Sequence, residues 1–160
     1  MTIQAGDSIP AATLYEMGSD GPAAVSTDDL FKGKTVVLFG IPGAFTPTCS
    51  AQHLPGFKNL ASQIKAKGVD EIVCFAVNDA FVMGAWGKDQ GVGDDVRMIA
   101  DGDAELTKKM GLELDLNGKG LGLRCERFAM VVENGVVKTI DVEAPGEFAV
   151  SSAEAQLSKL

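Results

Sequence analysis

The stretch TVVLFGIPGAFTPTCS, residues 35–50, decides the organisation of this chain. It opens with an apolar and β-branched run, residues 35–39, which is typical of a buried strand. Prolines and glycines follow, and they predict a loop. From Ser50 to Lys67, apolar residues recur every three or four positions, which predicts a helix. The pattern therefore predicts a strand, a loop and a helix, with Cys49 where the loop meets the helix.

The surroundings of Cys49 indicate a reactive thiol rather than an inert one. Free N–H groups and the positive end of the helix dipole favour an anion at a helix start. A thiol in that place loses its proton more readily, and the thiolate is the reactive form. Inert buried cysteines are common. Here, however, Thr46 and Thr48 offer hydroxyls to a sulfur or a substrate oxygen, and Pro42 and Pro47 stiffen the loop.

The loop also resembles a known motif. Residues 42–50, PGAFTPTCS, resemble the peroxidatic loop of the peroxiredoxins, with the pattern Pro-x-x-x-Thr-x-x-Cys matched by Pro42, Thr46 and Cys49. This version of the motif is similar to the fifth peroxiredoxin subfamily, which includes the plant type II enzymes. Downstream segments extend the resemblance over nearly the whole chain: HLPGF at 53–57, VNDAFVM at 77–83 and RFAMVV at 127–132.

The resemblance implies a thiol peroxidase that reduces hydrogen peroxide and alkyl hydroperoxides through a cysteine sulfenic acid, without metal, haem or flavin. Cys49 would be the nucleophile and Thr46 the hydroxyl that holds the peroxide. Pro42 would shield the sulfur from water. An anionic sulfur and a developing alkoxide both favour a nearby cation, and the family's active-site arginine matches Arg127.

Arg127 also has a simpler interpretation from the residues alone, as a surface arginine paired with Glu126 or Glu133. The resemblance favours the active-site role. Three further side chains are expected to contact the substrate: Thr48, Phe45 and Arg124. The backbone N–H groups of Thr48 and Cys49 are expected to add donors, as helix starts do for anions.

His53 lies one helical turn after Cys49, on the same face of the predicted helix. A Cys/His pair also suggests a protease or an acyl transferase. A histidine on the same helix, however, would have to bend back along it to reach the sulfur. We therefore interpret His53 as a hydrogen-bonded histidine near a loop or a subunit contact.

The other cysteines bear on how the enzyme would be recycled. Cys74, inside an apolar run, is either an inert thiol or, by resemblance to plant type II members, a resolving thiol that needs local unfolding. Animal members carry a resolving cysteine in the C-terminal segment, where this chain has Ser151. Recycling by glutathione with glutaredoxin, or by thioredoxin, is therefore expected. Cys125 is interpreted as incidental.

Composition excludes several classes of function. A net charge of −8 argues against nucleic acid and anionic membranes as partners, and no apolar run approaches the roughly 20 residues of a membrane span. The N-terminus shows no signal peptide. Three cysteines and one histidine do not match a zinc site. An odd cysteine count without a secretory signal indicates a reducing compartment, the cytoplasm, or an organelle if a presequence has been removed.

The rest of the chain predicts one domain over residues 1–160, with strands and helices alternating. Asn78-Asp79 is expected to cap a helix from Ala80 to Asp89. Arg124–Glu133 is expected to be a strand, and Asn134-Gly135 a hairpin turn. Ser151 with Glu154 reads as a capping box that opens a last helix. The order predicts an α/β sheet with helices on both faces. The resemblance makes this a thioredoxin-like fold, a central mixed sheet with an N-terminal extension.

Three aromatics, Phe45, Phe81 and Trp86, are expected on loops or helix faces next to the predicted active loop. Core packing is their default interpretation, and the resemblance suggests that some of them line a homodimer contact and an apolar funnel for alkyl peroxides.

Two rival functions can be distinguished from a peroxidase. A thiol–disulfide oxidoreductase would need a second cysteine close to Cys49, and residues 50–52 offer none. A redox sensor or chaperone-like module remains an alternative, which repeated turnover would distinguish from an enzyme.

Overall fold

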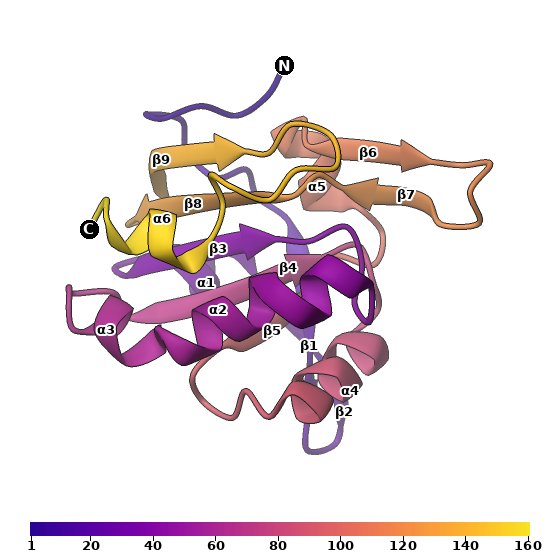
Figure 1. Cartoon of the computed structure of the whole chain (residues 1–160), viewed down its shortest axis with the longest axis horizontal. Helices are drawn as coiled ribbons and strands as arrows, with labels where there is room; N and C mark the ends of the chain where they lie inside the picture. The colour runs from indigo at the N-terminus through magenta and orange to yellow at the C-terminus, as the bar shows by residue number, and fades with distance from the viewer.

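The computed structural model describes residues 1–160. Figure 1 shows its helices packed around a central group of strands. The strands are β1 Thr13–Gly18, β2 Gly21–Ser26, β3 Thr35–Gly40, β4 Glu71–Ala76, β5 Arg97–Ala100, β6 Glu113–Leu116, β7 Gly122–Cys125, β8 Phe128–Glu133 and β9 Val136–Val142. The helical elements are α1 Thr27–Phe31, the π-helical turn η1 Cys49–His53, α2 Leu54–Asn59, α3 Ala61–Lys65, α4 Ala80–Gln90, α5 Glu105–Met110 and α6 Ala153–Leu157.

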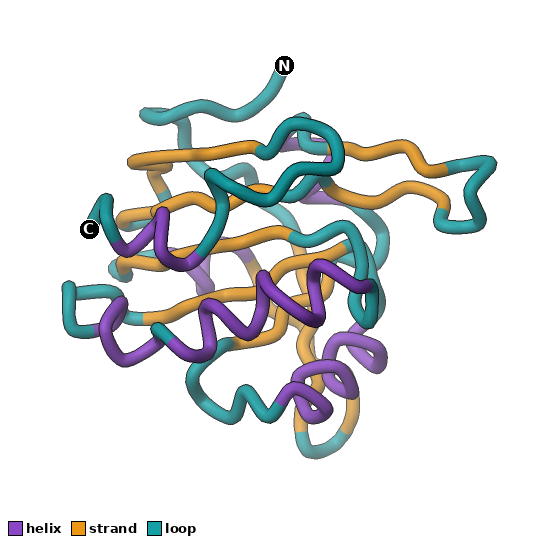
Figure 2. The backbone as a smooth tube through the Cα atoms, in the orientation of Figure 1, coloured by secondary structure: helices purple, strands orange, loops and turns teal.

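Seven strands form one mixed sheet in the order β2-β1-β5-β4-β3-β8-β9. The central strands β3, β4 and β5 run parallel, and the outer strands pair antiparallel. The hairpin of β6 and β7 is a separate two-stranded sheet, which projects from one end of the molecule (Figure 2). The mixed sheet predicted from the sequence is confirmed. No helix in the structure is long and apolar enough to span a bilayer.

Strand β3 shows why the predicted apolar run is buried on both faces. Val37 and Phe39 belong to the core between the sheet and the helices α2, α3, α4 and α6. Val36 and Leu38 point the other way, into a second core under α1 and α5. Alternate side chains of a strand face opposite sides, so a strand between two helical layers is apolar throughout. The helices on both faces are therefore as expected.

Two local predictions are confirmed. Asn134 and Gly135 both have positive φ angles, 48° and 78°, as a tight two-residue hairpin between β8 and β9 requires. Asp79 caps α4, because its carboxylate accepts a hydrogen bond of 2.8 Å from the Val82 N–H.

The strand expected over Arg124–Glu133 is wrong in one respect. The chain leaves the β6–β7 hairpin at Cys125 and enters the main sheet at Phe128, so Glu126 and Arg127 lie between two strands. The Glu126 N–H donates to the carbonyl of Leu112 rather than to a sheet neighbour. The residues before Glu126 and after Arg127 both have strand-like sequences, so the sequence alone does not indicate that the chain passes from one sheet to the other. The Glu143 N–H donates to the Arg127 carbonyl at 2.9 Å, so Arg127 lies just beyond the end of the β8–β9 pairing.

The capping box expected at Ser151 is also wrong. Ser152 caps α6 by accepting a hydrogen bond of 3.1 Å from the Ala155 N–H. Ser151 is fully buried, and its hydroxyl donates to the Glu143 carboxylate at 2.7 Å. Only Ser151 has a glutamate three residues later, but either serine can cap a helix, and the distant Glu143 carboxylate binds Ser151 instead.

The helix expected from Ser50 to Lys67 is present but irregular. It opens with the π-helical turn η1, in which the Leu54 N–H donates to the Cys49 carbonyl. At Leu60 the backbone departs from helical angles, which separates α2 from α3. Cys49 stands at the start of this helical segment, as predicted.

Candidate active site

The loop between β3 and η1 is held in place by hydrogen bonds from distant parts of the chain. The Ala44 N–H donates to the Asn78 side-chain oxygen at 3.0 Å. The guanidinium of Arg124, on β7, donates to the Pro42 carbonyl at 3.2 Å. These contacts fix the path of the loop that delivers Cys49.

The sulfur of Cys49 faces a single cation. Cys49 is fully buried, and its Sγ accepts a hydrogen bond of 3.0 Å from Nη2 of Arg127. A guanidinium at that distance stabilises a negative charge on the sulfur. Arg127 forms no ion pair with either acidic neighbour proposed for it, and Glu133 instead pairs with Lys138 at 3.0 Å. The structure therefore places Arg127 at the sulfur and not on the surface in an ion pair.

His53 holds the other side of the guanidinium. Its Nδ1 lies 2.8 Å from Nη1 of Arg127, and its Nε2 lies 2.9 Å from the Ser151 carbonyl. Burial, followed by the positive charge of Arg127, lowers the pKa of His53 to about 3. The ring is therefore neutral near pH 7, with Nε2–H donating to the carbonyl and Nδ1 accepting from the guanidinium. Both nitrogens are engaged, so His53 is not the base that an acyl transferase would need.

Phe148 completes the surroundings of the guanidinium. Its ring centroid lies 5.9 Å from Cζ of Arg127, and it meets the His53 ring edge-on at 5.0 Å. Arg127 is thus positioned by a neutral imidazole, an aromatic face and the sulfur. Because none of these except an ionised sulfur carries a negative charge, the charge of Arg127 remains available to the sulfur and to a bound oxygen.

The predicted threonines lie in the loop that carries the sulfur. The Thr46 hydroxyl donates to the Gly43 carbonyl at 2.6 Å, which leaves its lone pairs free to accept from a protonated peroxide. The N–H groups of Thr48 and Cys49 donate to no other group of the protein. The expected donors at the helix start are therefore present and unoccupied.

A cavity of about 150 Å³ adjoins this group, and Pro42, Thr48 and Arg127 are part of its wall. Arg124 does not line it, and acts on the site through its bond to the Pro42 carbonyl. Phe45 does not line it either. Its side chain is 53% exposed, and its φ of 64° is unusual for a bulky residue. Cys49 and Thr46 also lie behind the wall rather than in it, so the substrate contacts expected of Phe45 and Arg124 stay predictions.

The remaining cysteines are protonated thiols in the core. Cys74 lies on β4 opposite Phe39, and burial raises its pKa well above the ordinary value. Burial likewise raises the pKa of Cys125 to about 12. The Cys125 Sγ donates to the Ile41 carbonyl at 3.2 Å, so this thiol helps to support the loop.

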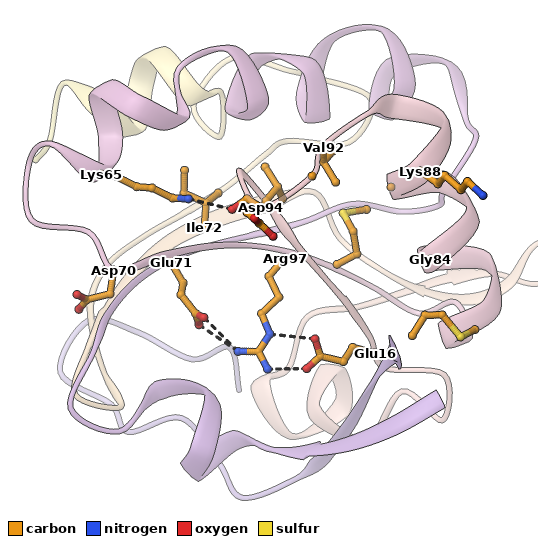
Figure 3. Close-up of a pocket in the computed structure, with 15 residues that line it drawn as sticks. Glu16, Lys65, Asp70, Glu71, Ile72, Gly84, Lys88, Val92, Asp94 and Arg97 are labelled. Carbon is orange, nitrogen blue, oxygen red and sulfur yellow. Dashed lines mark hydrogen bonds and ion pairs between the residues drawn. The ribbon is translucent and has the colours of Figure 1, made fainter. Parts of the chain in front are cut away.

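The largest cavity, about 700 Å³, lies elsewhere, between β1, β4, β5 and α4. Figure 3 shows Arg97 inside it, between the carboxylates of Glu16 and Glu71. The closest contacts are 2.5 Å to Glu16 and 3.2 Å to Glu71. Lys65 is engaged with the Asp94 carbonyl at 3.0 Å. The charge of Arg97 is neutralised by the two carboxylates, and no cysteine lines this cavity, so it offers no centre for thiol chemistry.

Sequence reasoning assigned His53 only a general hydrogen-bonded role and did not single out Phe148 or Glu143. The single available signal was the four-residue spacing between Cys49 and His53, which puts both on one helix face. Nothing in the local sequence indicates that Ser151 meets His53, because 98 residues separate the two.

Comparisons with known proteins give matches over nearly the whole chain. A family model described as Redoxin matches residues 4–157. Peroxiredoxin-2C of Arabidopsis thaliana is 50% identical over 159 residues, covering 99% of this chain and 98% of the relative. The crystal structure of reduced Prx3 in complex with hydrogen peroxide from Vibrio vulnificus has a TM-score of 0.95 and 52% identity, covering 99% of each chain.

A more distant structure extends the likeness. Peroxiredoxin 5 from Alvinella pompejana has a TM-score of 0.86 and 33% identity, and the match covers 98% of this chain and 96% of that one. Other relatives are named as chloroplastic and mitochondrial forms. These matches confirm the thioredoxin-like fold predicted from the sequence.

Proposed function

Because the chain belongs to the peroxiredoxin family, as a member of its fifth, plant type II-like subfamily, we propose that its thiol peroxidase activity proceeds through a sulfenic acid on Cys49. The observation that carries the proposal is the 3.0 Å contact between the Cys49 sulfur and the Arg127 guanidinium. It provides both a stabilised thiolate and a cation beside the atoms that gain charge.

In the first step, the sulfur lone pair forms an S–O bond with one oxygen of the hydroperoxide while the O–O bond breaks. The other oxygen leaves as an alkoxide or hydroxide and takes up a proton, giving alcohol or water. Sulfur loses two electrons and becomes Cys49–SOH, and the peroxide gains them. The Vibrio vulnificus relative was crystallised with hydrogen peroxide, which supports this substrate here.

The surrounding groups would act on the two peroxide oxygens. Arg127 would stabilise the thiolate and then the leaving oxygen, and the Thr46 hydroxyl would accept a hydrogen bond from the protonated peroxide. The free N–H groups of Thr48 and Cys49 would donate to the oxygen that develops charge. Pro42, in the cavity wall, would limit the access of water.

Recycling would use an external thiol. One thiol condenses with Cys49–SOH to a mixed disulfide with loss of water, and a second thiol then releases Cys49 as the pair of thiols leaves as a disulfide. Cys74 would have to leave the central strand β4 to compete, and Ser151 offers no sulfur in the C-terminal segment. Glutathione with glutaredoxin, or thioredoxin, are the proposed reductants, and a side-by-side turnover assay distinguishes them.

A homodimer and a cytoplasmic location complete the proposal. Phe81 and Phe45 are 64% and 53% exposed, an apolar surface that a second copy could cover, whereas Trp86 is fully buried and belongs to the core. Sedimentation of the wild-type protein tests the dimer. The three cysteines are free thiols, which suits a reducing compartment such as the cytoplasm, and fractionation of the source cells tests this location.

The decisive experiment separates the three cysteines. Cys49→Ser is expected to abolish peroxide consumption, because serine supplies no thiolate. Cys74→Ser and Cys125→Ser are the matched controls, and each is expected to keep the first oxidation, read by mass spectrometry of peroxide-treated protein. Loss of that first oxidation in either control would move the nucleophile away from Cys49. Repeated turnover with added thiol would favour an enzyme over a sensor that is oxidised once.

A further inference from the structure

We propose that carboxylates around the cavity beside Arg127 make this enzyme selective for uncharged hydroperoxides, and slow toward hydroperoxides that carry a negative charge. The inference rests on the proposed role of Cys49, because it concerns which substrates reach that sulfur.

Three glutamates contribute to the wall of this cavity. Glu126 comes from the break between β7 and β8, and Glu143 and Glu147 come from the segment that follows β9. Arg127 is the single cationic residue among the lining residues. None of the three glutamates forms an ion pair with a lysine or arginine, in contrast to Glu16 and Glu71 in the larger cavity. Their charges are therefore not neutralised locally.

The geometry of Glu143 keeps it ionised. Burial opposes ionisation, but hydrogen bonds from Ser151 and Ala149 outweigh burial and lower the pKa of Glu143. The donors are the Ser151 hydroxyl at 2.7 Å, the Ser151 N–H at 2.9 Å and the Ala149 N–H at 2.8 Å, all to Oε2. A carboxylate fixed in this way is a permanent negative charge in the cavity wall.

Glu126 stands on the opposite side of the cavity from Glu143 in the chain, between β7 and β8. Burial, followed by the charge of Glu113, raises the pKa of Glu126. Glu147 is exposed at the outer part of the wall and has no paired cation. An anion that approaches the cavity therefore meets carboxylates on both the β7–β8 side and the C-terminal side.

The nearby cations do not cancel the negative charge of these carboxylates. Arg127 is engaged by the Cys49 sulfur, whose thiolate offsets its charge, and by His53, which is neutral. The other nearby cation, Arg124, keeps its charge but does not line the cavity, and its guanidinium donates to the carbonyls of Pro42 and Leu121. Charges that surround a cleft change association rates of charged substrates by factors of about 10 to 1,000, whereas neutral substrates feel little of this effect.

The test compares one hydroperoxide with and without a charge. β-Hydroperoxyisovalerate and its methyl ester present the same tertiary peroxide, and single-turnover loss of the Cys49 thiol after rapid quenching gives a rate constant for each, independent of any reductant. We expect the anion to react about 10-fold more slowly than the ester at low salt. The difference between the two rate constants is expected to shrink as added salt screens the carboxylates.

Charge-neutralising variants then locate the effect. In Glu126→Gln with Glu147→Gln, the anion-to-ester rate ratio is expected to rise about 3- to 10-fold. Glu143 is left intact because its bonds hold the chain at Ser151. Asp20→Asn removes one charge at the tip of the β1–β2 hairpin, away from this cavity, and is expected to leave the ratio unchanged.

Each outcome has a defined meaning. A wild-type ratio near one, or an unchanged ratio in the double variant, would overturn the inference while the activity itself stands. An equal rise of the ratio in Asp20→Asn would assign the effect to net charge and would also overturn it. Failure of Cys49 to react with either peroxide would instead contradict the proposed function.

Discussion

Two arginines of this chain, Arg97 and Arg127, sit in cavities but have opposite surroundings. Arg97 lies between the carboxylates of Glu16 and Glu71, which connect β1, β4 and β5 (Figure 3). Arg127 contacts a neutral histidine, an aromatic ring and a sulfur, and none of the glutamates around its cavity forms an ion pair with it. The larger cavity thus holds a neutralised cation, whereas the smaller one holds a cation whose charge acts on the sulfur.

The difference shows what makes an arginine useful for chemistry. A guanidinium that is paired with carboxylates helps to hold the strands of the sheet together. Its positive charge is neutralised, so it attracts a substrate only weakly. A guanidinium held by uncharged partners is oriented without being neutralised. The volume of a cavity is therefore a poorer guide to function than the charge state of the groups that hold its cation.

The strongest test removes the charge of Arg127. In Arg127→Gln, the rate constant for Cys49 oxidation by hydrogen peroxide is expected to fall about 100- to 1,000-fold, the usual effect of deleting one donor to a developing anion. Stopped-flow or competition kinetics measures the rate, and the ultraviolet absorbance of the thiolate reports the ionised sulfur at neutral pH. A rate within about twofold of wild type would remove Arg127 from the mechanism.

The second test concerns the neutral partner. The pKa of His53 is lowered from 6.5 to about 3 in the folded protein. Below about pH 6.5, His53 is therefore protonated in the unfolded chain but stays neutral in the folded protein. Folding stability therefore falls as the pH drops through this window, by about 2 kcal/mol from this residue at pH 5. Urea titrations at pH 7.5 and pH 5 are expected to show that loss in wild type and not in His53→Gln.

Glutamine is chosen because it can accept from Arg127 and donate to Ser151 without titrating. His53→Ala serves as the comparison that removes both contacts, and it should slow peroxide reduction more than glutamine does. Equal pH dependence of stability in wild type and His53→Gln would show that the imidazole is not held neutral by the fold.

The smallest effect is expected at the other arginine. Arg97→Gln removes two partly exposed ion pairs, whose side chains are between 26% and 29% accessible, so solvent screening limits the loss to about 1 kcal/mol of unfolding free energy. Peroxide reduction is expected to stay at the wild-type rate. If folded Arg97→Gln lost as much activity as Arg127→Gln, the conclusion that Arg97 has no part in peroxide reduction would be wrong.

Sequence reasoning succeeded where the signal was local. The apolar run of β3, the Asn134-Gly135 turn and the Asp79 cap each depend on neighbouring residues, and each is confirmed. The position of Cys49 at a helix start was predictable in the same way. Arg127 stands 78 residues away from Cys49, and only the resemblance to peroxiredoxins could bring it to the sulfur.

The failures all involve partners distant in the sequence. No sequence pattern predicts the strand β2, whose alanines are exposed and which forms because it pairs with β1. The sequence predicts Ser151 as a helix cap, but its buried hydroxyl donates a hydrogen bond to the Glu143 carboxylate instead. The break at Glu126 and Arg127 depends on where the β6–β7 hairpin ends. No propensity of the single residues encodes these choices, because tertiary contacts decide them.

The hydrogen bonds that lead from Glu143 through Ser151 to His53 have a practical consequence for the C-terminus. A protease that cut the chain before Ser151 would remove the carbonyl that orients the imidazole, and with it the support of the guanidinium, without touching Cys49. An affinity tag joined after Leu160 lies beyond α6 and leaves these contacts in place. A tag can therefore follow Leu160, but the segment from Ser151 to Leu160 cannot be removed without loss of the contacts at His53.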